Sequence, residues 1–284
     1  MKANELTHMR PVVEKELLHH DILFCLDKEN LLDILTFQGG TSLRLCYGAD
    51  RFSEDLDFTG GLEFSQTNLM NMKACIEHYI GERYGLEVFV KNPKELKIEK
   101  RYKEINVDVW QIRITTSPER KDLPKQMIKI EVINIPSYTQ ELHIIRQHYD
   151  FLPDGYSDVL INVESLDEIL ADKIISLVDC RSYIRYRDIW DIQWLMRQNA
   201  KLNIEFIQQK IKDYKISDYG ERLSYTITAL PSMIGDGQFK NQMSRFIPMS
   251  AQERTLSKNK FFIFLEEELK RILMETQTRI TKII

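Results

Sequence analysis

Two aspartates that stand two positions apart, Asp55 and Asp57, are the residues best suited to chemistry in this chain. Leu56 and Phe58 alternate with them, which is the pattern of a half-buried β-strand. Residues i and i+2 of a strand point to the same face, so the two carboxylates should converge. A divalent cation relieves the repulsion between them, and Mg²⁺ binds carboxylates together with phosphate oxygens. The pair therefore suits a metal–nucleoside triphosphate complex. An exposed edge strand is the better explanation of such a pair alone, and it is weakened here by the glycine turn upstream.

A glycine pair lies upstream, directly before a predicted short helix over residues 41–47. Gly39 and Gly40 would let the backbone approach an anion closely, and the start of a helix offers unpaired N–H groups. Thr41 and Ser42 add hydroxyl donors. The arrangement suits a phosphate group, although a plain turn is the commoner meaning of a glycine pair.

A metal-dependent phosphoryl-transfer site usually needs a third carboxylate on a neighbouring strand. Residues 126–135 show the clearest strand alternation. Glu131 should point to the face of this strand opposite to that of Ile128, Ile130 and Val132. Asp108, in a second alternating segment over residues 106–115, is the runner-up. Either could instead be an ordinary solvent-facing residue, so the choice stays open.

Three charged residues stand on predicted helices further along the chain. Lys173 borders the apolar stripe of a helix over residues 166–180, so its ammonium should reach either solvent or an anion such as a triphosphate. We therefore expect its removal to leave thermal stability nearly unchanged. Asp188 and Asp191 share a face of the next helix, where pairing with Arg185 or Arg187 is the alternative to a catalytic role.

The 284 residues favour two domains, because the hydrophobic period changes near residue 158. We expect an α+β domain over residues 1–155, a mixed sheet with flanking helices, and an all-helical domain over residues 156–284. In the first we expect two helical segments between residues 12 and 35. In the second we expect a loop at Pro231–Gly237.

The composition narrows the class of protein. The net charge of −4 disfavours capture of nucleic acid by the whole surface, although residues 91–103 and 240–284 are locally basic and are either solvated surface or RNA contacts. Four scattered cysteines without a CxxC pair fit a reducing compartment. No apolar run approaches the length of a membrane span. We expect a soluble, cytoplasmic protein with no membrane partner.

Four sequence blocks occur in an order that resembles a known family. They read GGTSLR at residues 39–44, RFSEDLDF at 51–58, DKI at 172–174 and RDIWDI at 187–192. Together they are similar to the signature of the AbiEii/AbiGii nucleotidyltransferase toxins. These are the toxin halves of AbiE-type abortive-infection toxin–antitoxin systems, within the polymerase-β-like nucleotidyltransferase superfamily. The resemblance covers about residues 35–200, and residues 200–284 carry no such motif.

This resemblance implies a polymerase-β-like core and a set of site residues. The residues implied to bind the nucleotide are Gly39, Gly40, Thr41, Ser42, Arg44, Ser53 and Lys173. Those implied to bind Mg²⁺ or Mn²⁺ are Asp55 and Asp57, with Glu131 matching by position. Asp55, Asp57, Lys173, Asp188 and Asp191 would form the catalytic set. Thr41 departs from the serine of many relatives but keeps the hydroxyl.

The sequence therefore predicts a metal-dependent nucleotidyltransferase that joins a nucleotide to an acceptor hydroxyl. The resemblance implies an RNA acceptor such as the tRNA 3′ end, and an antitoxin protein as partner. Two alternatives remain at this stage: a glycosyltransferase that uses the D-x-D pair, and a module that binds nucleotide or partner without turnover.

Overall fold

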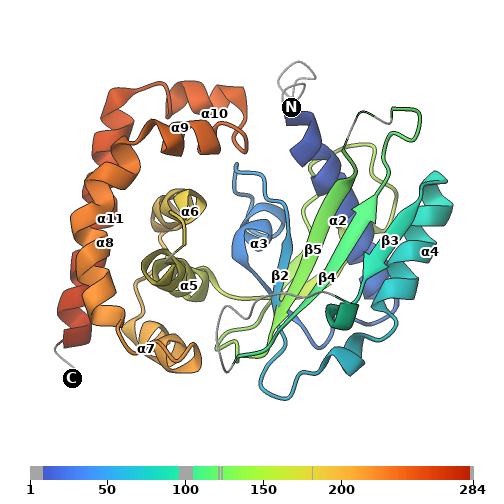
Figure 1. Cartoon of the computed structure of the whole chain (residues 1–284), viewed down its shortest axis with the longest axis horizontal. Helices are drawn as coiled ribbons and strands as arrows, with labels where there is room; N and C mark the ends of the chain where they lie inside the picture. The colour runs from blue at the N-terminus through green and yellow to red at the C-terminus, as the bar shows by residue number, and fades with distance from the viewer. Residues whose placement is uncertain (1–8, 96–104, 121, 123, 181, 282–284) are drawn as a thin grey trace. The chain divides into compact units, whose positions relative to one another are not determined.

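The computed structural model describes residues 9–95, 105–120, 122, 124–180 and 182–281. Its internal contacts divide the chain into two compact units, one from Arg10 to Glu164 and the other from Ser165 onward with Met9. Figure 1 colours the first unit from blue to green and the second from olive to red. The assignment of separate functional domains to residues 1–155 and 156–284 stays a prediction.

A mixed sheet is the scaffold of the first unit. In the described residues its strands are β1 (Thr36–Gln38), β2 (Leu56–Thr59), β3 (Val88–Lys91), β4 (Val107–Ile114), β5 (Gln126–Ile133), β6 (Glu141–Ile144) and β7 (Leu160–Val163). Their spatial order is β3-β4-β5-β2-β1-β7-β6. The pairs β2–β5 and β1–β7 are parallel and the other neighbours are antiparallel.

The described helices of the first unit pack on one face of this sheet. The helices of this unit are α2 (Arg10–Lys28), α3 (Gly39–Leu45) and α4 (Met72–Tyr84), with short 3₁₀ turns η2 (Gln66–Leu69), η3 (Pro93–Glu95) and η4 (Tyr156–Asp158). Ile22 of α2 and Ile76 of α4 pack in one core with Phe58 and Ile130 of the sheet. The alternate strand residues, Asp57 and Glu131 among them, therefore face away from this core.

Some expectations for this unit are confirmed and others are wrong. The alternation at residues 126–135 does form a strand, β5. The second helical segment before residue 35 is wrong, because Asn30 takes a left-handed φ of 55° and the chain turns into β1. Leu32 and Leu35, whose spacing had indicated a helix, are instead buried in the turn.

The second unit is helical, as predicted. Its described helices are α5 (Leu166–Asp179), α6 (Tyr186–Arg197), α7 (Ile204–Asp213), α8 (Tyr219–Gly235), α9 (Gly237–Met243), α10 (Met249–Arg254) and α11 (Asn259–Thr281). Ser165 caps α5 by accepting from the backbone N–H of Glu168 at 3.3 Å. The loop expected from Pro231 is wrong, because α8 continues through Pro231 to Gly235. The break comes at Asp236, whose side chain accepts from the Gln238 N–H and caps α9.

A buried lysine joins two helices of this unit. Lys210 of α7 has no exposed surface, and its Nζ lies 2.8 Å from Oε1 of Glu168 and 2.7 Å from Oδ2 of Asp172. A lysine is buried so completely only where carboxylates compensate its charge. The three residues therefore fix α7 to α5, the helix that carries Lys173.

A histidine of α2 is buried without hydrogen bonds to other described residues. His20 is 2 % exposed and neither of its ring nitrogens has a partner there. It lies near Glu16, Arg44, His148 and Tyr149, and burial lowers its pKa to about 4.

We expect His20 to make folding acid-sensitive. Between pH 6.5, its ordinary pKa, and about 4, the unfolded chain binds a proton that the folded chain does not bind, so stability is lost as the pH falls. The expected loss from this group is on the order of 3 kcal/mol. Urea unfolding of the wild type and of His20→Phe at several pH values measures it. His148 titrates in both proteins, so only the additional loss in the wild type reports on His20. An equally steep fall of the free energy of unfolding with falling pH in His20→Phe would contradict the expectation.

Candidate active site

The first glycine of the turn packs directly against Asp57. Gly39 opens α3 with a φ of +76°, a conformation that favours glycine. A Cβ at Gly39 would lie 2.7 Å from Oδ2 of Asp57, closer than real Cβ contacts. The glycine turn and the aspartate pair, which are separate in the sequence, therefore form one structure.

The second glycine packs against Arg51, a residue that sequence reasoning left out of the site. A Cβ at Gly40 would collide with the Arg51 guanidinium and lie 3.1 Å from Oγ of Ser53. Arg51 is 3 % exposed, and its Nη1 donates to the carbonyl of Phe52 at 2.8 Å. The sequence signal for Arg51 was its place in the block RFSEDLDF, four residues before Asp55.

The two hydroxyls predicted to bind phosphate form hydrogen bonds within the protein. Thr41 Oγ1 donates to the carbonyl of Asp55, and Ser42 Oγ donates to the carbonyl of Gly39 at 2.9 Å. Both residues are buried. These bonds hold the turn against the segment that leads into β2, and a phosphate contact by either hydroxyl stays a prediction.

The register of the sheet brings two of the predicted carboxylates together. Asp57 in β2 lies directly opposite Glu131 in β5, and the Gln38 residue at the end of β1 lies opposite Asp57 on its other side. Asp55 stands just before β2, where its Oδ1 accepts from the Lys129 N–H at 3.0 Å. That bond continues the β2–β5 pairing by one further residue, so Asp55 is held at the start of the same strand.

Asp108 lies on the opposite face from Asp57 and Glu131. It pairs with Val132, whose side chain belongs to the core, whereas Glu131 pairs with Val109. Asp108 is 5 % exposed and accepts from Nδ2 of Asn106, and burial raises its pKa. Of the two carboxylates that the sequence left open, only Glu131 therefore lies on the face of Asp57.

Arg44 is not brought to the carboxylates. Its Nε and Nη2 donate to both carboxylate oxygens of Glu16 on α2 at 2.8 and 3.0 Å, and its Nη1 donates to the carbonyl of Ala49. Burial alone would raise the pKa of Glu16, but the Arg44 guanidinium outweighs it and the pKa is lowered. The guanidinium is thus committed to an ion pair between α3 and α2, and a nucleotide contact by Arg44 stays a prediction without support in this geometry.

In the second unit Lys173 is paired with both predicted aspartates. Its Nζ lies 3.0 Å from Oδ1 of Asp188 and 3.0 Å from Oδ2 of Asp191, and all three residues are buried. Arg185 also forms an ion pair with Asp188, and Ser176 donates to it at 2.6 Å. Burial would raise the pKa of Asp188, but Lys173 and Arg185 outweigh it and hold the pKa far below its ordinary value. The spacing of residues along the helix of Lys173 did not predict this pairing, because Asp188 and Asp191 stand on the next helix, α6.

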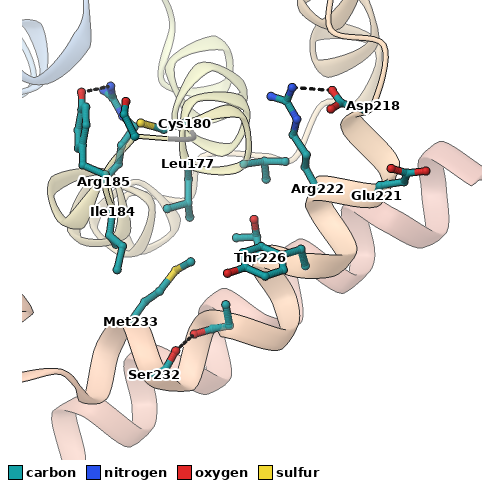
Figure 2. Close-up of a pocket in the computed structure, with 15 residues that line it drawn as sticks. Leu177, Cys180, Ile184, Arg185, Asp218, Glu221, Arg222, Thr226, Ser232 and Met233 are labelled. Atoms are coloured by element: carbon teal, nitrogen blue, oxygen red, sulfur yellow. Dashed lines mark hydrogen bonds and ion pairs between the residues drawn. The ribbon is translucent and has the colours of Figure 1, made fainter.

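A pocket of about 550 Å³ opens in the same unit, lined by the end of α5, the following loop and α8. Figure 2 shows Arg222 pointing toward Asp218, with Ile184 and Met233 among the other side chains that line the pocket. Lys173, Asp188 and Asp191 are not among the lining residues. The pocket reaches these residues only through Arg185, which lines it and pairs with Asp188.

Comparison with known proteins gives a family and a fold. The sequence model of the nucleotidyl transferase AbiEii toxins of type IV toxin–antitoxin systems matches residues 21–267. No curated protein matches the sequence. A candidate nucleotidyltransferase from Helicobacter pylori is similar in structure, with 17 % identity, a TM-score of 0.51 and coverage of 100 % of this chain and 99 % of that chain. MenT4, a nucleotidyltransferase toxin from Mycobacterium tuberculosis H37Rv, has 17 % identity, a TM-score of 0.52 and coverage of 96 % and 94 %. These likenesses support the predicted mixed α+β fold.

The geometry of Lys173 reverses the expectation that its removal leaves stability unchanged. Lys173→Met keeps the length of the side chain but removes the ammonium that contacts two buried carboxylates, of which Asp188 keeps its ion pair with Arg185. Loss of one partner of a buried pair costs about 3–5 kcal/mol, which should lower the melting temperature by on the order of 10 °C. Thermal unfolding followed by circular dichroism measures this. Lys270→Met, on the exposed surface of α11, is the matched control and should melt with the wild type. Equal melting of both variants would contradict the buried pairing.

Proposed function

Because the chain belongs to the family of AbiEii nucleotidyltransferase toxins of type IV toxin–antitoxin systems, we propose that it joins a nucleotide to an acceptor hydroxyl in a metal-dependent reaction. The hydroxyl oxygen attacks the α-phosphorus of a nucleoside triphosphate, and pyrophosphate leaves. One observation carries the proposal. The register of β2 and β5 pairs Asp57 with Glu131, on a strand that packs against the glycine turn.

The carboxylates of the first unit fit a hard divalent cation. Asp57 and Glu131 stand on adjacent strands about 4.8 Å apart, and Asp55 begins the strand of Asp57. Carboxylate oxygens are the ligands that Mg²⁺ and Mn²⁺ prefer. We therefore assign these three residues as metal ligands. A metal bound there would supply positive charge that offsets the charge of the phosphates.

The glycine turn is proposed to hold the triphosphate. Gly39 and Gly40 carry no side chains that would cover the backbone, and the Thr41 and Ser42 bonds hold the shape of the turn. Arg51 places a buried positive charge against Gly40. A cation fixed in this way favours an anion at the turn without a loss of side-chain entropy on binding.

For the helical unit we propose that Lys173 takes part in the reaction and that Asp188 and Asp191 hold its ammonium in position. The support is the order of the family's sequence blocks together with the ion pairs of 3.0 Å. Asp188 stays ionised at neutral pH because its pKa is held low, so the clamp on Lys173 persists under working conditions.

The acceptor and the partner are further parts of the proposal. We propose that the acceptor is RNA, such as the 3′ end of tRNA, that an antitoxin protein blocks the activity, and that the reaction takes place in the cytoplasm. The family supports an antitoxin in general terms, since its toxins belong to toxin–antitoxin systems. None of the described helices combines the length and apolar character needed to cross a bilayer.

The two alternatives have no observation in their favour. A glycosyltransferase would release a nucleoside diphosphate rather than pyrophosphate, and a binding module would leave the nucleotide intact. The family match over residues 21–267 favours neither of them.

The experiment that tests the proposal uses each labelled nucleoside triphosphate with total RNA and Mg²⁺, followed by a denaturing gel and a pyrophosphate assay. We expect label on RNA and release of pyrophosphate. Asp57→Asn should lower the rate by about 10²-fold or more, the scale for removal of one electrostatic partner. Since the substitution also removes a negative charge from a crowded face, the fold should be retained.

Asp108→Asn is the matched control, because Asp108 lies on the opposite face of the same sheet. It should retain the wild-type rate. Equal activity of Asp57→Asn and the wild type would exclude the assigned site. Release of nucleoside diphosphate, or intact nucleotide after long incubation, would instead support one of the alternatives.

A further inference from the structure

We propose that the face of strands β3, β4 and β5 that points away from the core of the first unit binds the single-stranded end of the RNA acceptor, an inference that rests on the proposed function. We call this surface the open sheet face, and its residues are Phe89, Lys91, Arg113, Met127 and Lys129. Figure 1 shows β4 and β5 running side by side, with β3 at the edge of the sheet.

The strand register sets these residues in rows that lead to the carboxylates. Phe89, Arg113 and Met127 form the outermost row. The next row consists of Lys91, Gln111 and Lys129. Glu131 and Asp57 follow in the third row. From Met127 to Glu131 the distance along β5 is about 13 Å, so a strand laid on this face would end at the proposed metal ligands.

Exposed apolar side chains stand on this face, where burial would be the usual outcome. Phe89 is 46 % exposed and Met127 is 43 % exposed, whereas Val90, Ile112 and Ile128 on the other face have no exposed surface. An exposed aromatic ring on a sheet is a platform on which a base can stack. Lys73 of α4 lies with its Nζ 5.2 Å from the centre of the Phe89 ring and adds a cation at the same place.

The charge of the face opposes that of the whole chain. Lys91, Arg113 and Lys129 contribute three positive charges, in a protein whose net charge is −4. Within the described residues neither Lys91 nor Arg113 has an ion-pair partner, and Lys129 has only Glu131 at 3.8 Å. Lys91 and Arg113, two cations without an acidic partner among the described residues, lie beside an exposed ring and match the phosphates and bases of a single strand.

The pocket of the helical unit is a weaker candidate for the same ligand. Its two arginines are already compensated, Arg185 by Asp188 and Arg222 by Asp179 and Asp218. Figure 2 shows the contact of Arg222 with Asp218. A polyanion would have to break these pairs, whereas Lys91 and Arg113 on the open sheet face have no ion pair to break within the described residues.

The test measures binding apart from catalysis. The full-length protein is titrated, without nucleotide or metal, into a fluorescent single-stranded RNA of about 12 nucleotides, and anisotropy is recorded. Phe89→Ala should raise Kd by about 5-fold to 150-fold, the range for loss of one stacked base, and Phe89→Trp should retain binding. Arg113→Ala should reduce the slope of log K against log salt by about 0.7.

Matched controls come from exposed residues elsewhere. Phe151→Ala removes a ring that is 72 % exposed but lies off this face, and Arg271→Ala removes an exposed arginine of α11. Both should bind as the wild type. Wild-type binding by Phe89→Ala and Arg113→Ala would overturn the proposal, as would tighter binding of duplex RNA or of single-stranded DNA than of single-stranded RNA.

The design separates this surface from the proposed function. Asp57→Asn should lose nucleotide transfer yet bind the RNA as the wild type. If transfer to RNA occurs in the wild type and Phe89→Ala leaves Kd unchanged, the surface is wrong while the function stands. If no transfer occurs but Phe89→Ala weakens binding and Phe151→Ala does not, the surface stands without the function.

Discussion

The pairing of β2 with β5 is the constraint on which the site depends. It holds Asp57 beside Glu131, although two neighbouring carboxylates repel each other. What prevents a shift is the other face of the same strands, where Leu56 and Ile130 are fully buried. A slip of one residue would expose the apolar side chains and bury the charged ones, so the core fixes the carboxylates in position. The energy that maintains this arrangement thus comes from hydrophobic burial rather than from the site itself.

Away from these carboxylates, the structure compensates buried charge with specific partners. Arg44 is neutralised by Glu16, Lys173 by Asp188 and Asp191, and Lys210 by Glu168 and Asp172. Each group joins two helices of its own unit. Because an unpaired buried charge costs several kcal/mol, removal of one member should disturb packing as well as chemistry. Activity measurements on Lys173 variants therefore need a parallel measurement of stability.

The sequence predicted those features that depend on local periodicity. The strand around Glu131 and the helix expected over residues 166–180 both form, because neighbouring residues determine them. Short strands such as β7 offer too few residues for a pattern, and the helix through Pro231 is stabilised by packing against its neighbours. The choice of Glu131 over Asp108 required the register between strands. Periodicity within one helix could not predict the partners of Arg44 and Lys173, since they stand on the neighbouring helices α2 and α6.

The order of strands in the sheet has a consequence for how the protein folds. Its central strands pair with segments made much later in synthesis: β2 with β5, and β1 with β7. Such non-local pairings require long loops to close before any contact is gained, which slows folding. On a ribosome, Asp57 would emerge well before the strand that bears Glu131. Until β5 is made, the edge of β2 beside the glycine turn would have no strand to pair with. Such an unpaired edge is prone to aggregation and can be bound by a chaperone. Translation must therefore pass Val163 before the sheet can close.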